Sequence, residues 1–280
     1  MTPLSFALDA MARDSTSRPE RPRLRRGMYL LPSAFTIGNI LLGFYAVILG
    51  IREGDFQTAA LLIFAAGILD ALDGRIARMS GTDSEFGKEY DSLADVLTFG
   101  SAPAWLCYYW GLSGLGRIGW LVPLYFLVCC ATRLARFNVQ TKVVDSRYFV
   151  GLPAPAAAGA VCSVLFFAPN QEWKPWATGF LVAALLLVGS LMVSTFRYRS
   201  FKQFDLRRRW SYRVALPIAA VILIVAYWPE AFFLILAVLY TTSGPIAWLT
   251  GKLRSRRASS QATPSKASHA PSELKPEETP

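Results

Sequence analysis

Four aspartates stand at fixed intervals in two short stretches of an otherwise apolar part of the chain. Asp70 and Asp73 are three residues apart, and Asp91 and Asp95 are four residues apart. On α-helices these spacings place both members of each pair on one face. A charged side chain at membrane depth is costly, so its presence there indicates a function. Two neighbouring helices can therefore direct four carboxylates at one point.

Carboxylates gathered at one point indicate a site for hard divalent cations. Their negative charges would otherwise repel one another and favour protonation. Oxygen-only ligands of this kind select ions such as Mg²⁺ or Mn²⁺. We therefore predict a two-metal site for Mg²⁺ or Mn²⁺ whose ligands are Asp70, Asp73, Asp91 and Asp95.

Small and polar residues beside the acids suit a phosphate ligand. Gly74 shares the face of the first aspartate pair, and Gly87 lies one turn before Asp91, so a substrate can approach the backbone at both glycines. Arg78 can pair with a phosphate through its planar guanidinium. Ser84, in the turn between the two stretches, is either a nucleotide contact or a helix N-cap.

Asn39 lies in the apolar run that precedes the acidic stretches, three residues after Thr36. On a helix these two side chains share a face. They either hydrogen-bond to another helix or reach a bound nucleotide, and the spacing alone leaves both possibilities open.

The spacing Asp-x2-Asp-Gly-x2-Ala-Arg-x8-Gly-x3-Asp-x3-Asp is complete between residues 70 and 95 and resembles the signature of the CDP-alcohol phosphotransferase family. The resemblance implies an enzyme that transfers a phosphoalcohol from a CDP-linked donor to a second alcohol and releases CMP. It makes Asp95 both a metal ligand and the general base for the incoming hydroxyl. It assigns metal binding to Asp70, Asp73 and Asp91, and CDP binding to Gly74, Arg78 and Gly87, with Ser84 and Asn39 as further candidates.

The stretches 133–138, 149–155 and 200–202 resemble the branch of that family that uses L-serine as the acceptor. Arg133 and Arg136 lie three residues apart near the end of an apolar run. A guanidinium can grip the carboxylate of serine or a donor phosphate, although both arginines could instead be interfacial anchors. The candidates for acceptor or phosphate binding are Arg133, Arg136 and Asn138.

The composition indicates a membrane protein. Of the 280 residues, 53% are hydrophobic and 17% are charged, which is too apolar a balance for an ordinary soluble domain. The formal net charge of +10 lies in the tails and in alternate loops, so we expect membrane lipids rather than nucleic acid as partners. Eight apolar runs approach the length of a membrane-crossing helix. They cover residues 33–51, 55–79, 88–112, 117–138, 152–169, 175–194, 212–227 and 230–249.

These runs predict an all-α, polytopic membrane helix bundle of about eight transmembrane helices with a six-helix catalytic core. Basic residues gather in the segments that eight crossings place on the same side as both termini, above all in 195–211. The positive-inside rule makes that side cytoplasmic. We expect a multi-pass homodimer of the cell (inner) membrane whose active site faces the cytoplasm. The predicted domains are a basic arm (1–28), a membrane core (29–211), two additional transmembrane helices (212–250) and a disordered cytoplasmic tail (251–280).

The resemblance implies transfer of the phosphatidyl group of CDP-diacylglycerol to L-serine, which forms phosphatidylserine and CMP by metal-assisted in-line displacement. Glycerol 3-phosphate, an inositol phosphate or choline are alternative acceptors within the same family. A cation transporter is the alternative from another class, but it requires acidic residues spread along a path through the bilayer. Beyond Trp210 no catalytic pattern is visible.

Overall fold

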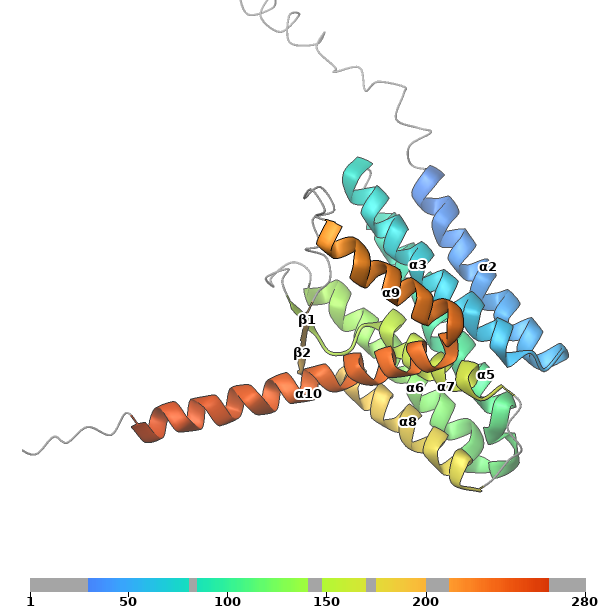
Figure 1. Ribbon diagram of the computed structural model, residues 1–280. Helices are drawn as coiled ribbons and strands as arrows, with labels where there is room; N and C mark the ends of the chain where they lie inside the picture. Colours follow the sequence, from blue (N-terminus) through green and yellow to red (C-terminus); the bar gives the residue numbers. More distant parts are fainter. Residues whose placement is uncertain (1–29, 81–84, 141–147, 170–174, 200–211, 262–280) are drawn as a thin grey trace, which may run out of the picture.

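The computed structural model describes residues 30–80, 85–140, 148–169, 175–199 and 212–261 (Figure 1). Within these ranges the chain is a bundle of helices with one small two-stranded ribbon. The helices are α2 (Leu30–Arg52), α3 (Phe56–Ser80), α4 (Glu85–Asp95), α5 (Ala102–Cys107), α6 (Arg117–Gln140), α7 (Ala154–Phe167), α8 (Pro175–Val193), α9 (Tyr212–Tyr227) and α10 (Pro229–Gln261).

The α4 and α5 helices belong to one continuous helical rod. They are joined by a π-helical segment, Val96–Ser101, and a second π-helical segment, Tyr108–Leu112, follows α5. The residues at these junctions keep right-handed helical dihedral angles, so the rod does not break. Wide π turns are frequent near functional sites, and the first one begins directly after Asp95.

A tight connection places α2 and α3 side by side (Figure 1). Gly54 has a φ of 68°, a left-handed conformation that glycine adopts without steric cost. Asp55 then caps α3, because its Oδ1 accepts a hydrogen bond of 2.9 Å from the backbone N–H of Thr58. This hairpin fixes the end of α3 that lies far from its aspartates.

Close helix packing in the bundle depends on small residues. The α2 helix packs against α3, α6 against α8, and α7 against both α3 and α10. Small side chains let helix backbones approach closely, as is common in membrane bundles. The fully buried alanines at these contacts are Ala46, Ala59, Ala60, Ala66, Ala157 and Ala158.

The length and apolarity of several helices fit a membrane protein. Among the described residues, three helices are long and apolar enough to cross a membrane: Ala34–Arg52, Arg117–Val139 and Pro229–Thr250. The helices Ala154–Phe167 and Thr178–Val193 are apolar but shorter. The predicted helical membrane bundle is therefore confirmed in outline, whereas eight crossings and a six-helix core stay predictions.

Two features differ from the sequence prediction. The helix α10 continues to Gln261, well beyond the predicted end at residue 249. The apolar run ends near residue 249, but residues that favour a helix, such as Lys252, continue beyond it. The chain also forms a short antiparallel ribbon, β1 (Tyr148–Val150) with β2 (Arg197–Arg199), in which Phe149 pairs with Tyr198. Strands of three residues are too short to give a recognisable alternating pattern.

The ribbon is anchored by a glycine corner. Gly151 has a φ of 82°, and its N–H donates to the Phe196 carbonyl at 2.8 Å. The next N–H, of Leu152, donates to the Leu191 carbonyl in the last turns of α8 at 3.1 Å. A Cβ at position 151 would collide with the carbonyl oxygen of Met192. Only glycine therefore fits this corner.

We predict that Gly151→Ala destabilises the protein by about 2 kcal/mol or more, since it combines a strained φ with a collision against backbone. Thermal unfolding of the purified protein in detergent measures the effect. Gly179→Ala on α8 is the matched control, because a methyl group added at Gly179 would meet nothing within 4 Å. Equal melting temperatures for the two variants would contradict this account of the corner.

Candidate active site

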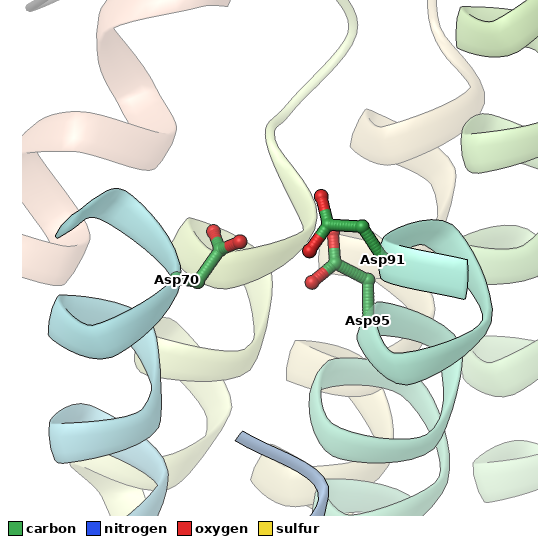
Figure 2. A group of neighbouring side chains, drawn as sticks. All are labelled: Asp70, Asp91 and Asp95. Atoms are coloured by element: carbon green, nitrogen blue, oxygen red, sulfur yellow. The ribbon is translucent and has the colours of Figure 1, made fainter. Parts of the chain in front are cut away.

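Three of the four predicted aspartates converge between α3 and α4. One carboxylate oxygen from each of Asp70, Asp91 and Asp95 lies within 4.8 Å of the other two. Figure 2 shows Asp70 on one helix facing Asp91 and Asp95 on the other. The i,i+4 spacing on α4 puts its two acids on the face that looks toward α3. The predicted meeting of two acidic helix faces is therefore observed for these three residues.

Asp73 lies beside this cluster and is held by another helix. Its Oδ2 accepts a hydrogen bond of 2.9 Å from the hydroxyl of Thr36 on α2. Its Oδ1 is buried and has no hydrogen-bond partner among the described residues. The charge of Asp73 interacts with that of Asp91. Its role as a metal ligand stays a prediction.

The carboxylate cluster includes a buried oxygen that no described residue satisfies. Asp95 is only 8% exposed, and its Oδ1 has no hydrogen-bond partner in the described part of the chain. Arg133 on α6 lies close enough to attract Asp95 and Asp70. Three carboxylates in so small a volume repel one another. The donor set therefore fits a divalent cation, which prefers carboxylate oxygen ligands.

The predicted CDP contacts are placed only in part. Gly74 follows Asp73 on α3, and Gly87 is exposed in the first turn of α4, one turn before Asp91. Arg78 belongs to the last turns of α3, but its side chain lies outside the described part of the structure, as does Ser84.

Asn39 on α2 is a buried polar side chain that the protein itself leaves unsatisfied. It is 1% exposed, and neither its Nδ2 nor its Oδ1 has a hydrogen-bond partner among the described residues. Its main-chain carbonyl accepts a bond of 3.1 Å from Thr98. The neighbouring Thr36 bonds to Asp73 on another helix, whereas the role of the Asn39 amide in nucleotide binding stays a prediction. Buried polar groups need hydrogen-bond partners.

The three candidate acceptor contacts on α6 have different surroundings. Arg133 lies within electrostatic range of Asp95 and Asp70, with its guanidinium carbon 5.6 Å from the centre of the Phe137 ring. Arg136 donates from Nη1 to the carbonyl of Val193 at the end of α8, at 3.3 Å. Cations at helix C-termini stabilise the unpaired carbonyls there. The structure therefore brings only Arg133 to the acids.

Asn138 connects α6 to the helix that carries two of the aspartates. Its Nδ2 donates to the Ser92 hydroxyl at 3.0 Å and to the Glu89 carboxylate at 3.3 Å. The Ser92 hydroxyl also lies 3.0 Å from the carbonyl of Lys88, to which it donates. Ser92 is adjacent to Asp91, so these hydrogen bonds link the acidic end of α4 to α6. Sequence reasoning missed Ser92 and Glu89, since their spacing to Asn138 follows no local pattern.

Comparison with known proteins agrees with this geometry. The model of the CDP-alcohol phosphatidyltransferase family matches residues 29–196, more than half of the chain. The chain is 36% identical over 223 residues to CDP-diacylglycerol–serine O-phosphatidyltransferase of Helicobacter pylori, a match that covers 79% of this chain and 92% of that protein.

Two further relatives carry the same name. The Bacillus subtilis protein is 34% identical over 181 residues, which cover 63% of this chain and 93% of that protein. The Methanocaldococcus jannaschii protein is 33% identical over 216 residues, which cover 77% and 92%. The complete aspartate motif lies inside the matched region, and the predicted family is confirmed. The chain belongs to the CDP-alcohol phosphatidyltransferase family.

Proposed function

We propose that the protein transfers the phosphatidyl group of CDP-diacylglycerol to L-serine, giving phosphatidylserine and CMP. The observation that carries this proposal is the convergence of Asp70, Asp91 and Asp95 from two helices inside the family-matched region. The names of the relatives support serine as the acceptor.

Two divalent ions, Mg²⁺ or Mn²⁺, are the proposed cofactors. Asp70, Asp91 and Asp95 would hold them, with Asp73 as a further ligand through its Oδ1, which no described residue hydrogen-bonds. Bound divalent ions supply charge neutralisation at the pyrophosphate oxygens during an in-line displacement. The closeness of these carboxylates and the burial of Asp95 support this assignment, because a bound cation offsets the repulsion among like charges that have little water around them.

The chain's own residues are proposed to hold the donor and move one proton. Gly74 and Gly87 leave room for the CDP part at the backbone, Arg78 and Ser84 reach its phosphates, and the amide of Asn39 supplies a hydrogen-bonding group. The serine hydroxyl oxygen forms a bond to the phosphatidyl phosphorus while the pyrophosphate bridge breaks and CMP leaves. Asp95 takes the proton of that hydroxyl as the general base.

Arg133 is the proposed acceptor contact. Its guanidinium lies at the carboxylate cluster and can bind the carboxylate of serine through two parallel hydrogen bonds. The Phe137 ring beside it restricts its position. Arg136 and Asn138 are assigned to the same acceptor side. Their hydrogen bonds connect α6 to the end of α8 and to α4 there.

The proposed topology is a homodimer in the cell (inner) membrane with eight crossings per chain and the site facing the cytoplasm. Each predicted apolar run overlaps one helical segment of the described chain, which supports this topology. In this topology the acidic stretches fall on the same side of the membrane as the basic segments of the sequence, which supports a cytoplasmic site.

The acceptor is tested by CMP release and lipid product analysis with purified protein, CDP-diacylglycerol and Mn²⁺. We expect phosphatidylserine with L-serine and no comparable product with glycerol 3-phosphate, an inositol phosphate or choline. Asp95→Asn should keep the fold and lose turnover by at least about a hundredfold, because the general base is gone. Product from another acceptor in place of serine would overturn the acceptor, and full activity of Asp95→Asn would overturn its role.

Metal binding is tested by thermal unfolding with and without Mn²⁺. Without the ion, Asp91→Asn should melt at a higher temperature than the wild type, since one repelling charge is removed. Mn²⁺ should stabilise the wild type and raise the melting temperature of the variant far less. Asp55→Asn is the control, because asparagine also caps helices well. An equal Mn²⁺ shift in all three proteins would contradict the site.

A further inference from the structure

The last helix, α10, is fixed to the core near its middle by Tyr198 of β2. The buried hydroxyl of this tyrosine donates a hydrogen bond of 3.1 Å to the carbonyl of Thr241. That carbonyl lacks its usual helical donor, because residue 245 is a proline without an N–H. Gly244 leaves room for the tyrosine, since a Cβ there would collide with the Tyr198 ring.

Beyond this contact α10 leaves the bundle. The helix runs obliquely across the other helices, and its C-terminal end extends past them (Figure 1). Its apolar part, Pro229–Thr250, is long enough to cross a membrane, and the helix continues from there to Gln261. The ring of Trp248 still contacts Phe196, with the ring centres 5.7 Å apart. The remaining turns therefore follow directly on a membrane-crossing helix.

The two ends of α10 contact opposite ends of the core. At its start, Glu230 accepts a hydrogen bond of 3.2 Å from Gln57, at the end of α3 that lies far from the aspartates. Near its exit, Trp248 contacts Phe196, which lies in the strongly basic segment 195–211. The positive-inside rule makes that segment cytoplasmic. In the proposed topology the C-terminal end of α10 therefore emerges on the cytoplasmic side.

This end combines an apolar stripe with basic residues. Ile246 and Leu249 are 57% and 52% exposed, and Leu253 continues their stripe at the helical spacing i, i+3, i+7. Helical spacing places basic residues on both sides of the stripe, and these are Lys252, Arg254, Arg256 and Arg257. The sequence holds no acidic residue between positions 231 and 272, so the charge of this stretch is uniformly positive.

Trp248 and Lys252 have the geometry expected at a membrane surface. The tryptophan is 51% exposed, and the Nζ of Lys252 lies 4.8 Å from the centre of its ring. Tryptophan is enriched at the boundary between lipid and water. Lysine lays its apolar stem along such a surface while its ammonium group stays in water, and it is attracted to the ring face. These two residues therefore mark the water boundary along α10.

We propose that residues 246–257 of α10 form an interfacial helix that binds the headgroup phosphates of anionic lipids in the cytoplasmic leaflet. The inference rests on the proposed topology and not on the proposed acceptor. The apolar stripe lies at the boundary of the acyl chains, while the basic side chains pair with phosphates. Lipid is the partner that fits, because the stripe continues that of the membrane-crossing helix and the charge complements an anionic bilayer surface.

The test measures how lipid shields a fluorophore on this part of α10. The four native cysteines are buried, so a thiol-reactive dye labels an introduced Leu253→Cys in the full-length protein. The protein is placed in nanodiscs of phosphatidylcholine alone or with about 30% phosphatidylglycerol, and acrylamide serves as a neutral quencher in the water. We expect the anionic lipid to lower the quenching constant about twofold or more, and about 1 M NaCl to remove most of this shift by screening exposed charges.

A dye on the opposite face, at Ser255→Cys, should change little between the two bilayers. Two fourfold variants of the labelled Leu253→Cys protein lose equal charge. Lys252→Gln, Arg254→Gln, Arg256→Gln and Arg257→Gln together should abolish the shift, whereas Arg18→Gln, Arg21→Gln, Arg23→Gln and Arg25→Gln in the N-terminal arm should preserve it.

The inference is overturned if the dye at Leu253→Cys is quenched equally in both bilayers, or if the dye at Ser255→Cys shifts as much. Persistence of the shift without the four basic residues of α10 would also contradict it, because the lipid would then act elsewhere. Loss of the shift in the arm variant would contradict it as well, since net charge rather than this helix would then govern the response.

Discussion

The fold must hold three aspartate carboxylates close together although their like charges repel and one of them is buried. Asp70, Asp91 and Asp95 share a volume in which their oxygens lie within 4.8 Å of one another, and Asp95 is almost fully buried. Repulsion works against this arrangement, so the helices that carry the acids must be fixed independently of them. The α2–α3 hairpin, the packing of α4 against α2 and the hydrogen bonds of Asn138 to α4 connect these helices to the rest of the bundle.

Uncharged polar side chains make most of these connections. Thr36 bonds to Asp73, Asn138 to Ser92, and Tyr198 to the Thr241 carbonyl. Each one joins two elements that are far apart in sequence. Hydrogen bonds between helices are modest in energy within membranes, but they specify which faces meet. The site is thereby positioned by side chains that need not take part in the chemistry.

Local periodicity was sufficient to predict the elements and the acidic faces. The run 55–79 predicted the helix Phe56–Ser80, and the spacing of Asp91 and Asp95 predicted that they share a face. The partners of each side chain could not be predicted, because they come from other helices. Nothing near Asp73 indicates that Thr36 will hold one of its oxygens, and nothing near Asn138 indicates Ser92.

The contacts of the C-terminal helices were even less predictable from the sequence. The apolar run 230–249 predicts a helix but gives no sign of a role, and the significance of Pro245 and Gly244 appears only when Tyr198 is placed against them. The ribbon that presents Tyr198 is too short for a sequence pattern. The Thr241 carbonyl lacks its usual helical donor because Pro245 has no N–H, and it accepts from Tyr198 instead. This pairing is visible only in the structure.

The most direct measurement of the metal site is the anomalous scattering of Mn²⁺ in crystals of the protein grown with that ion. We expect a peak between α3 and α4, within bonding distance of carboxylate oxygens from Asp70, Asp91 and Asp95. A well-ordered structure with no anomalous peak there, or with these side chains turned toward separate surroundings, would contradict the convergence of the acids on a bound cation.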